Sequence, residues 1–223
     1  MALRFAALDT STEWCSVALW RDGEIAGVER RAGNRHSELA LPMLEKLLKE
    51  TGLAADKLDA VAFGAGPGSF TGLRIACGIA QGLAFPRGIP VLGVSTLEAL
   101  AEESGATRVL ACIDARMREV YYAALQREDR ATHRGWQEVV AARCAAPGAL
   151  ELPAGDWIGA GNGFAVYGNL GLKKVLPEVH PTAMAVARLA APRFAAGEGI
   201  DAALAAPVYV RDKVAFTKAE LGR

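Results

Sequence analysis

One stretch, residues 64–74, constrains the fold of this chain more than any other. It reads Gly-Ala-Gly-Pro-Gly-Ser-Phe-Thr-Gly-Leu-Arg and lies between an apolar run at 59–63 and a small-residue helical pattern at 75–85. Three glycines and a proline within five residues are typical of a tight turn that ordinary side chains cannot follow. Ser69 or Thr71 can cap a helix that begins here. The stretch therefore predicts strand, turn and helix, with a helix start that suits either a phosphate or close packing against another backbone.

The first half of the chain predicts three strands followed by alternating helices and strands. An Asp22-Gly23 pair joins the second and third strands as a hairpin. The first helix has one leucine-rich face and ends at Gly52, and Pro42 predicts that it starts or kinks near that residue. Ser95 and Glu98 form a capping box that opens the last helix. The predicted strands are 4–9, 15–20, 24–29, 60–64 and 90–94, and the predicted helices are 37–50, 70–85 and 96–105.

The second half repeats this order in a weaker form. Strand-like segments at 108–114, 119–126 and 136–140 precede a segment at 144–153 that is broken by proline and glycine. A strand at 157–160, a glycine-rich turn at 159–163, a poor helix, an apolar stretch near 175 and a helix at about 182–196 follow. Asp9 and Asp114 end the first strand of each half. The pattern predicts two copies of one β-β-β-α-β-α-β-α unit, an eroded second copy and a boundary near residue 106.

This repeated unit is typical of the α/β ribonuclease H-like fold of the actin, Hsp70 and sugar-kinase clan, an analogy that says little about chemistry. We expect an N-terminal domain at 1–106 and an eroded C-terminal domain at 107–223, whose last residues pack back on the first.

The charge balance and the apolar runs narrow the classes of function. The chain has 25 basic and 25 acidic residues, so no overall field attracts nucleic acid. No run reaches the roughly 20 apolar residues of a membrane span, and the N-terminus is too short for a signal sequence. The four cysteines show no paired spacing, which favours small buried side chains in a reducing cytoplasm.

Six segments together resemble a known family, the bacterial TsaB (YeaZ) proteins, which are paralogues of TsaD. The likeness is dense over residues 1–125 and sparse afterwards, and it depends on the order and spacing of the segments. They are Leu-Asp-Thr-Ser-Thr-Glu-Trp-Cys-Ser-Val-Ala-Leu at 8–19, Arg-His-Ser-Glu at 35–38 with Leu-Pro at 41–42, Gly-Pro-Gly-Ser-Phe-Thr-Gly-Leu-Arg-Ile at 66–75, Gly-Val-Ser-Thr-Leu-Glu-Ala-Leu-Ala at 93–101, Ile-Asp-Ala-Arg at 113–116 with Glu-Val-Tyr at 119–121, and Pro-Val-Tyr-Val-Arg at 207–211.

The resemblance implies a part in making N6-threonylcarbamoyladenosine (t6A) at adenosine 37 of tRNA. In that family's pathway, TsaD transfers the threonylcarbamoyl group and needs TsaB as a partner, together with the ATPase TsaE. TsaB is the non-catalytic member. The resemblance thus implies a cytoplasmic scaffold subunit that pairs with TsaD, pairs with itself when alone, and meets tRNA only through the complex.

The residues argue against catalysis by this chain. TsaD-like relatives hold a metal with two histidines four residues apart, and the matching positions here are Thr96 and Leu100. Ser69 lacks the flanking glycines of a nucleophile elbow, because Pro67 and Thr71 stand there. The glycine run also lacks the lysine of a phosphate-binding Walker loop. No catalytic residue and no metal site are therefore predicted, and a peptidase is a distant alternative.

A second hypothesis is a small-molecule kinase or ATPase of the same clan. Asp9, Thr10, Ser11 and Thr12 match the clan's first phosphate loop, where an aspartate orients Mg²⁺ and hydroxyls meet phosphate. The alternative is an aspartate and hydroxyls that satisfy a tight turn. The sister position at Asp114 lacks small residues, and the turn at 159–163 would be a relic of an adenosine loop. We expect no required cofactor, with weak or interfacial binding of ATP or ADP with Mg²⁺ as the alternative.

The remaining hypothesis is an interface on helix 70–85. Its glycines are costly inside a helix, by roughly 0.8–1.0 kcal/mol each relative to alanine, and they allow two backbones to approach. Ile75, Gly78, Ile79 and Gly82 fall on one stripe of the helix surface, and Ala76 and Ala80 are expected to widen it. By resemblance, this helix and helix 37–50 pair with TsaD, with Ser37 near the edge of the surface. The predicted interface residues are His36, Glu38, Phe70, Arg74, Ile75, Gly78, Ile79 and Gly82. The glycines of residues 64–74 are accordingly interpreted as serving approach to a partner.

Overall fold

A computed structural model of the chain describes residues 3–128 and 135–211. Its first sheet has the strand order β3-β2-β1-β4-β5. β1 pairs antiparallel with β2 and parallel with β4, so the antiparallel strands β2 and β3 and the parallel strands β4 and β5 lie on opposite sides of this central strand. These strands are β1 (Arg4–Asp9), β2 (Trp14–Arg21), β3 (Glu24–Arg31), β4 (Ala60–Gly66) and β5 (Val91–Ser95).

The second sheet repeats the first strand for strand. Its order is β8-β7-β6-β9-β10, with β6 antiparallel to β7 and parallel to β9. This one-to-one correspondence confirms the predicted duplication of a ribonuclease H-like α/β unit. The strands are β6 (Arg108–Arg116), β7 (Glu119–Arg127), β8 (Trp136–Ala145), β9 (Ile158–Ala160) and β10 (Lys174–Leu176).

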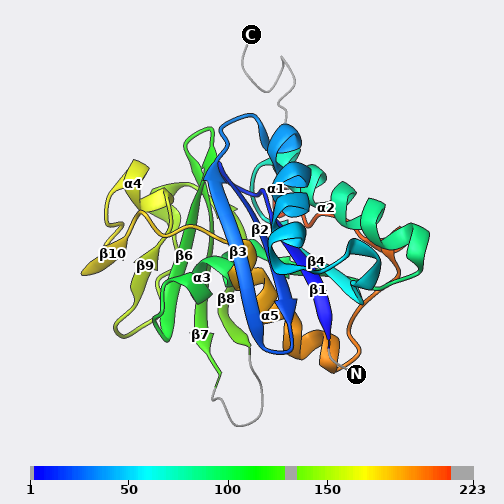
Figure 1. Cartoon of the computed structure of the whole chain (residues 1–223). Coiled ribbons are helices and arrows are strands. Elements are labelled where there is room, and N and C mark those ends of the chain that lie inside the picture. The colour runs from blue at the N-terminus through cyan, green and yellow to red at the C-terminus, as the bar shows by residue number, and fades with distance from the viewer. Residues whose placement is uncertain (1–2, 129–134, 212–223) are drawn as a thin grey trace.

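The helices form three layers around the two sheets (Figure 1). α1 (His36–Thr51) and α2 (Phe70–Ala84) cover the outer face of the first sheet, and α4 (Gly163–Tyr167) covers the outer face of the second. α3 (Thr96–Glu103) and α5 (Ala183–Ala195) lie between the sheets. Apolar side chains fill the spaces between these layers, so strands such as β1 are buried on both faces.

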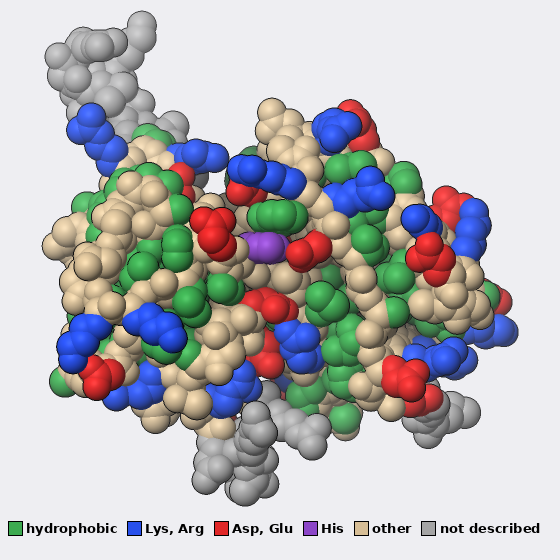
Figure 2. Space-filling model, turned by 60° about the vertical axis from the view of Figure 1, so that its left-hand side comes forward, with side chains coloured by type: hydrophobic (Ala, Val, Ile, Leu, Met, Phe, Trp, Pro, Cys, Tyr) green, Lys and Arg blue, Asp and Glu red, His purple; other side chains and the backbone are tan. Residues whose placement is uncertain are grey.

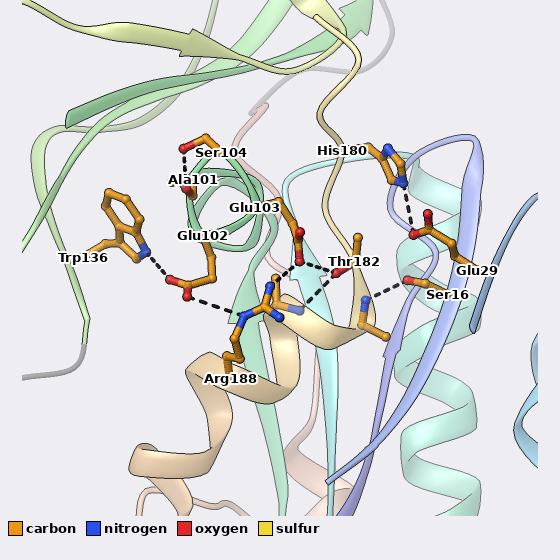
Figure 3. Close-up of polar contacts among 12 residues, drawn as sticks. Ser16, Glu29, Ala101, Glu102, Glu103, Ser104, Trp136, His180, Thr182 and Arg188 are labelled. Atoms are coloured by element: carbon orange, nitrogen blue, oxygen red, sulfur yellow. Dashed lines mark hydrogen bonds and ion pairs between the residues drawn. The ribbon is translucent and has the colours of Figure 1, made fainter. Parts of the chain in front are cut away.

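The two halves are joined through α3 and α5. The Glu102 carboxylate accepts hydrogen bonds from the Arg127 guanidinium at 2.7 Å and from the Trp136 indole at 3.2 Å. Arg188 of α5 contacts both Glu102 and its neighbour Glu103, and Thr182 donates to Glu103 at 2.7 Å (Figure 3). α5 therefore packs on the first sheet while being held to α3 by charged side chains.

The capping residues and glycines in the sequence predicted the ends of several helices correctly. Gly52 ends α1 in the left-handed region with φ of 66°, and Ser69 and Ser95 cap α2 and α3. Of the two alternatives for Pro42, the structure rejects a helix start near that residue: α1 begins at His36, so Pro42 lies inside the helix. β8 extends to residue 145, beyond the predicted 136–140. In the described part of the chain, four short 3₁₀ turns complete the elements: Ala55–Lys57, Phe85–Arg87, Pro147–Ala149 and Ala202–Leu204.

The end of the described chain returns to the first half. Ile200 forms a bridge with Val91 at the edge of β5. The Val208 amide donates to the Ala65 carbonyl at 2.7 Å, beside the glycine-rich turn. This return places residues 208–211 against the start of α2 and forms one wall of the site described next.

Candidate functional site

The glycine-rich turn between β4 and α2 packs directly on the loop that follows β1. A Cβ atom on Gly68 would stand 2.5 Å from the Ser11 carbonyl oxygen, and one on Gly72 would collide with the Thr10 carbonyl. The Ser69 amide donates to the Ser11 carbonyl at 2.7 Å. These glycines therefore serve close approach within the chain. The interpretation that they approach a partner is wrong for this turn.

Asp9 lies beneath the same turn and is fully buried. Its Oδ1 accepts from the Ser11 amide at 3.0 Å and from the Ser11 hydroxyl at 2.7 Å. Its Oδ2 faces Gly64, where any side chain would collide, and has no hydrogen-bond partner within residues 3–128 and 135–211. Burial raises the pKa of Asp9 to about 6, against the lowering effect of the two Ser11 hydrogen bonds.

The predicted phosphate loop is thus divided by the structure. Ser11 and Thr12 line an adjoining cleft, whereas the buried Thr10 donates its hydroxyl to the Gly72 carbonyl at 2.7 Å. Three of the four residues make hydrogen bonds that hold the turn, as in the structural alternative stated above: Thr10 bonds Gly72, and Ser11 bonds Asp9. Thr12 is the most accessible member of the group.

In the second half, a glycine-containing turn after β9 packs in the same way on the end of β6. Side chains on Gly161 or Gly163 would collide with the Cys112 residue of β6. The Asp114 amide donates to the Asn162 side-chain oxygen at 2.9 Å, which fixes the end of β6 to this turn. Packing against β6 thus accounts for Gly161 and Gly163, and close contact with Phe164 and Leu172 accounts for Gly159, without an adenosine loop.

A cleft of about 660 Å³ lies between these two turns and the returning chain end. One wall is the start of α2, where Phe70 is half-exposed and its ring lies 5.4 Å from that of Tyr209. Arg74 stacks 3.9 Å above the Phe70 ring and donates to the Tyr209 hydroxyl at 3.0 Å. The opposite wall is the end of β6, where Arg116 pairs with Asp114 at 3.3 Å.

Sequence reasoning did not find Tyr209 and Arg211 as parts of this cleft. Arg211 reaches the second half, where it donates to the Ala115 carbonyl at 3.1 Å and to the Glu119 carboxylate at 2.5 Å. The available signal was the Pro-x-Tyr-x-Arg segment at 207–211, which counted only toward the family resemblance. Its contacts tie residues 208–211 to both halves.

The histidines do not converge. His36 is 6% exposed and lines the cleft, so the structure places it inside the molecule and away from the edge of an exposed face. His180 stacks on Trp14 with ring centroids 4.3 Å apart and pairs with Glu29 at 3.2 Å. His133 lies outside the described residues. Thr96 and Leu100, which the resemblance matches to the paired histidines of TsaD-like proteins, are fully buried in α3. Within the described part of the chain, no group of three or more histidine, cysteine or acidic side chains could hold a metal ion.

The outer face of α2 is an uncovered stripe. Gly78 and Gly82 are exposed, and a Cβ atom on either would meet nothing within 4 Å among residues 3–128 and 135–211. Ile75 and Ile79 are partly exposed beside them. The prediction that Ala76 and Ala80 widen the stripe is wrong, since both are fully buried against the first sheet. The remaining predicted interface residues, Glu38, Phe70 and Arg74, are exposed.

The cysteines agree with the expectation of buried thiols. Cys15, Cys77 and Cys112 are buried, Cys144 is partly exposed, and all four are free. Burial raises the pKa of Cys15 to about 11 and that of Cys112 to about 12, which makes both poor nucleophiles. Among the described helices, none is long and apolar enough to cross a bilayer.

Comparison with known proteins agrees with the fold and with the resemblance. The family model described as "TsaD: tRNA N6-adenosine threonylcarbamoyltransferase" matches residues 28–215. The tRNA threonylcarbamoyladenosine biosynthesis protein TsaB of Escherichia coli (strain K12) is 39% identical over 232 residues, covering 97% of this chain and 98% of that protein. The protein of the same name from Haemophilus influenzae is 37% identical over 228 residues, covering 97% of each. The solved structure of YeaZ from Pseudomonas aeruginosa superposes with a TM-score of 0.86 at 40% identity, covering 93% of this chain and 99% of that one.

Proposed function

Because this chain belongs to the TsaB (YeaZ) family, we propose that it is a non-catalytic partner subunit of a TsaD-type transferase and acts in cytoplasmic t6A synthesis. The names of the full-length relatives support the pathway. The TsaD family model supports descent from a common fold with the transferase. The partner role and the absence of catalysis are our own inferences.

The observation that carries the partner role is the pair of exposed glycines on α2. Glycine in an exposed helix interior destabilises the helix by roughly 0.8–1.0 kcal/mol relative to alanine. Elsewhere in the chain, glycines such as Gly68 and Gly72 are explained by a nearby backbone, but no described residue lies within 4 Å of a Cβ on Gly78 or Gly82. A partner helix that approaches α2 closely would explain why glycine, and not a larger residue, stands at positions 78 and 82.

Apolar side chains surround these glycines. Phe85 is 65% exposed at the end of α2, and Leu41 is 49% exposed on the neighbouring α1. Together with the partly exposed Ile75 and Ile79, they give the α1–α2 face an apolar surface that a partner helix pair would cover. Two copies of this apolar face can cover each other. We therefore propose that the isolated chain pairs with itself through the α1–α2 face and that TsaD displaces the second copy.

The chemistry of transfer is assigned to the partner. The positions of the relatives' metal-binding histidines are buried core residues here, Thr96 and Leu100. The chain has 25 basic and 25 acidic residues, and side chains of both signs are intermixed on the face seen in Figure 2. We therefore propose that tRNA and the ATPase TsaE meet this subunit through the complex with TsaD.

The test is a pair of identical substitutions at two open glycines. Gly78→Glu places a charge in the middle of the proposed interface, and Gly148→Glu places one on a surface turn of the second half that is equally open. Glutamate favours a helix over glycine, so the Gly78→Glu monomer should be at least as stable as the wild type. We expect Gly78→Glu to lose co-purification with TsaD of the same organism, and Gly148→Glu to retain it.

Two results would overturn the proposal. Co-purification that survives Gly78→Glu would reject the α1–α2 face as the interface. Threonylcarbamoyl transfer to tRNA by the purified chain alone would reject the non-catalytic role. Calorimetry with Mg-ATP on the isolated chain tests the rival kinase or ATPase, which requires micromolar binding.

A further inference from the structure

We propose that Met117 is a site of oxidation by peroxides, and that its sulfoxide strengthens the tie between residues 208–211 and the second half of the chain. Met117 belongs to the turn between β6 and β7, whereas the proposed TsaD-binding face lies on α1 and α2. The proposal therefore stands or falls independently of the proposed function.

The turn between β6 and β7 holds Met117 in a fixed and exposed position. Residues 116–118 all lie in the left-handed region, with φ of 60°, 53° and 61°. Arginine and methionine rarely adopt this conformation, so contacts from outside the turn are needed to hold it. The Arg211 guanidinium supplies one of them, because it donates to the Ala115 carbonyl at 3.1 Å. Met117 itself is 57% exposed at the tip of the turn.

The Arg211 guanidinium has donors without a strong acceptor. Its Nη2 is well satisfied, since it donates to the Glu119 carboxylate at 2.5 Å as well as to the turn. Its Nη1 has the Met117 sulfur, 3.8 Å away, as acceptor, and its buried Nε has no partner among the described residues. A thioether sulfur is a weak acceptor, so this side of the guanidinium is only partly satisfied.

Oxidation of the sulfur would provide the stronger acceptor. A lone pair of the Met117 sulfur attacks one oxygen of hydrogen peroxide, and the S–O bond forms as the O–O bond breaks. The hydroxide that leaves takes the proton from the new S–OH group and becomes water. Sulfur loses two electrons and peroxide gains them. The sulfoxide oxygen is polar, and it can accept from Nη1 of Arg211 in a charge-assisted hydrogen bond.

Among the described sulfur atoms, that of Met117 is the one an oxidant in solution reaches most readily. Met43 is buried, and Met184 is partly buried against the core between the sheets. Three of the four cysteines are buried, and burial raises the pKa of the partly exposed Cys144. A raised pKa keeps that cysteine in the less reactive thiol form.

The strength of this tie affects how the two halves are joined. At one end of residues 208–211, the Val208 amide donates to the Ala65 carbonyl of the first half at 2.7 Å. At the other end, Arg211 holds the second half through the β6–β7 turn. A further hydrogen bond to the Met117 sulfoxide would make local opening of this short segment rarer.

The first experiment is limited oxidation of the full chain by hydrogen peroxide, followed by digestion and mass spectrometry of the peptides. We expect Met117 to gain one oxygen about tenfold faster than Met43 or Met184, because susceptibility follows exposure. Similar rates at the three methionines would overturn the assignment of the site. Oxidation of Cys144 before Met117 would overturn it as well.

The second experiment measures hydrogen exchange of the Val208 amide by NMR, before and after this oxidation. We expect exchange to become roughly threefold to tenfold slower in the oxidised wild type, as one added hydrogen bond at Arg211 implies. Met117→Leu keeps the apolar bulk and cannot form the sulfoxide, so the same peroxide treatment should leave its Val208 exchange unchanged. Unchanged or faster exchange in the oxidised wild type would overturn the proposal. Equal slowing in Met117→Leu would do the same, because the effect would then arise at another residue.

Discussion

Gly72 and Thr10 are locked together in both directions. Thr10 donates its hydroxyl to the Gly72 carbonyl at 2.7 Å, and the Thr10 carbonyl occupies the space that a Cβ on Gly72 would need. The two residues lie 62 positions apart in the sequence. This contact fixes the start of α2 against the end of β1 and so determines the shape of the cleft between them.

The contact predicts opposite effects for the same substitution at two glycines of α2. Gly72→Ala should lower the free energy of unfolding by about 1–3 kcal/mol, because the new methyl group meets backbone that cannot move away. Gly78→Ala should raise it by up to about 1 kcal/mol, because that position is an open helix interior. Urea unfolding of both variants measures the difference. Equal stability of the two variants would contradict the packing described here.

Asp9 should make stability depend on pH in an unusual direction. Burial raises its pKa from an ordinary value of about 3.9 to about 6. Between about pH 4 and pH 6 the folded protein keeps a proton on Asp9 that the unfolded chain releases. The contribution of this group to stability therefore falls as the pH rises through that window and stays low above it.

Asp9→Asn keeps the Oδ1 acceptor for Ser11 and removes the charge. We expect this variant to be more stable than the wild type at pH 7, by roughly 1–3 kcal/mol, and the difference to shrink toward pH 4. Urea unfolding from pH 4 to pH 8 measures it, with the exposed Asp156→Asn as a control that should show a small difference throughout. A variant less stable than the wild type at pH 7 would show that the carboxylate is needed in its charged form.

The network between α3 and α5 should contribute more to stability than a surface ion pair (Figure 3). Arg188→Met leaves Glu102 and Glu103, which are largely buried, without a shared cation. We expect a loss of about 1–3 kcal/mol in the free energy of unfolding. Lys173→Met breaks a fully exposed pair with Asp156 and should change it by less than about 0.5 kcal/mol. Losses of equal size would assign Arg188 no special role.

Two substitutions of Tyr209 separate the contribution of its hydrogen bond with Arg74 to stability from that of its ring contact with Phe70. Tyr209→Phe removes the acceptor for Arg74 and keeps the ring against Phe70, so we expect a loss of less than about 0.5 kcal/mol. Tyr209→Ala also removes the aromatic contact and should cost about 0.5–1.5 kcal/mol more. Thermal or urea unfolding of both variants gives the two values, and similar losses would mean that the ring contributes little.

Only part of the candidate site was predictable from the sequence. The turn at 64–74 marked the start of α2 correctly, because glycine and proline restrict the backbone locally. The direction in which its glycines face was not predictable, since the close contacts are with Thr10 and Ser11, far away in the chain. The faces of α2 were also ambiguous. Small residues lie on both the buried and the exposed face of this helix. No polar stripe in the sequence therefore distinguishes the buried Ala76 and Ala80 from the exposed Gly78 and Gly82.

The sequence by itself determined the duplicated order of strands and helices, the capped helix ends and the family, because periodicity, turn residues and motif spacing are properties of neighbouring residues. Only the tertiary structure decided that Asp9 is buried beneath the glycine-rich turn, that His36 lies in the cleft, and that Tyr209 and Arg211 close it. The physical reason is that burial, pKa and hydrogen-bond satisfaction depend on which distant segments meet. In this chain, which segments meet is set by the two sheets and by the return of residues 200–211 to the first of them.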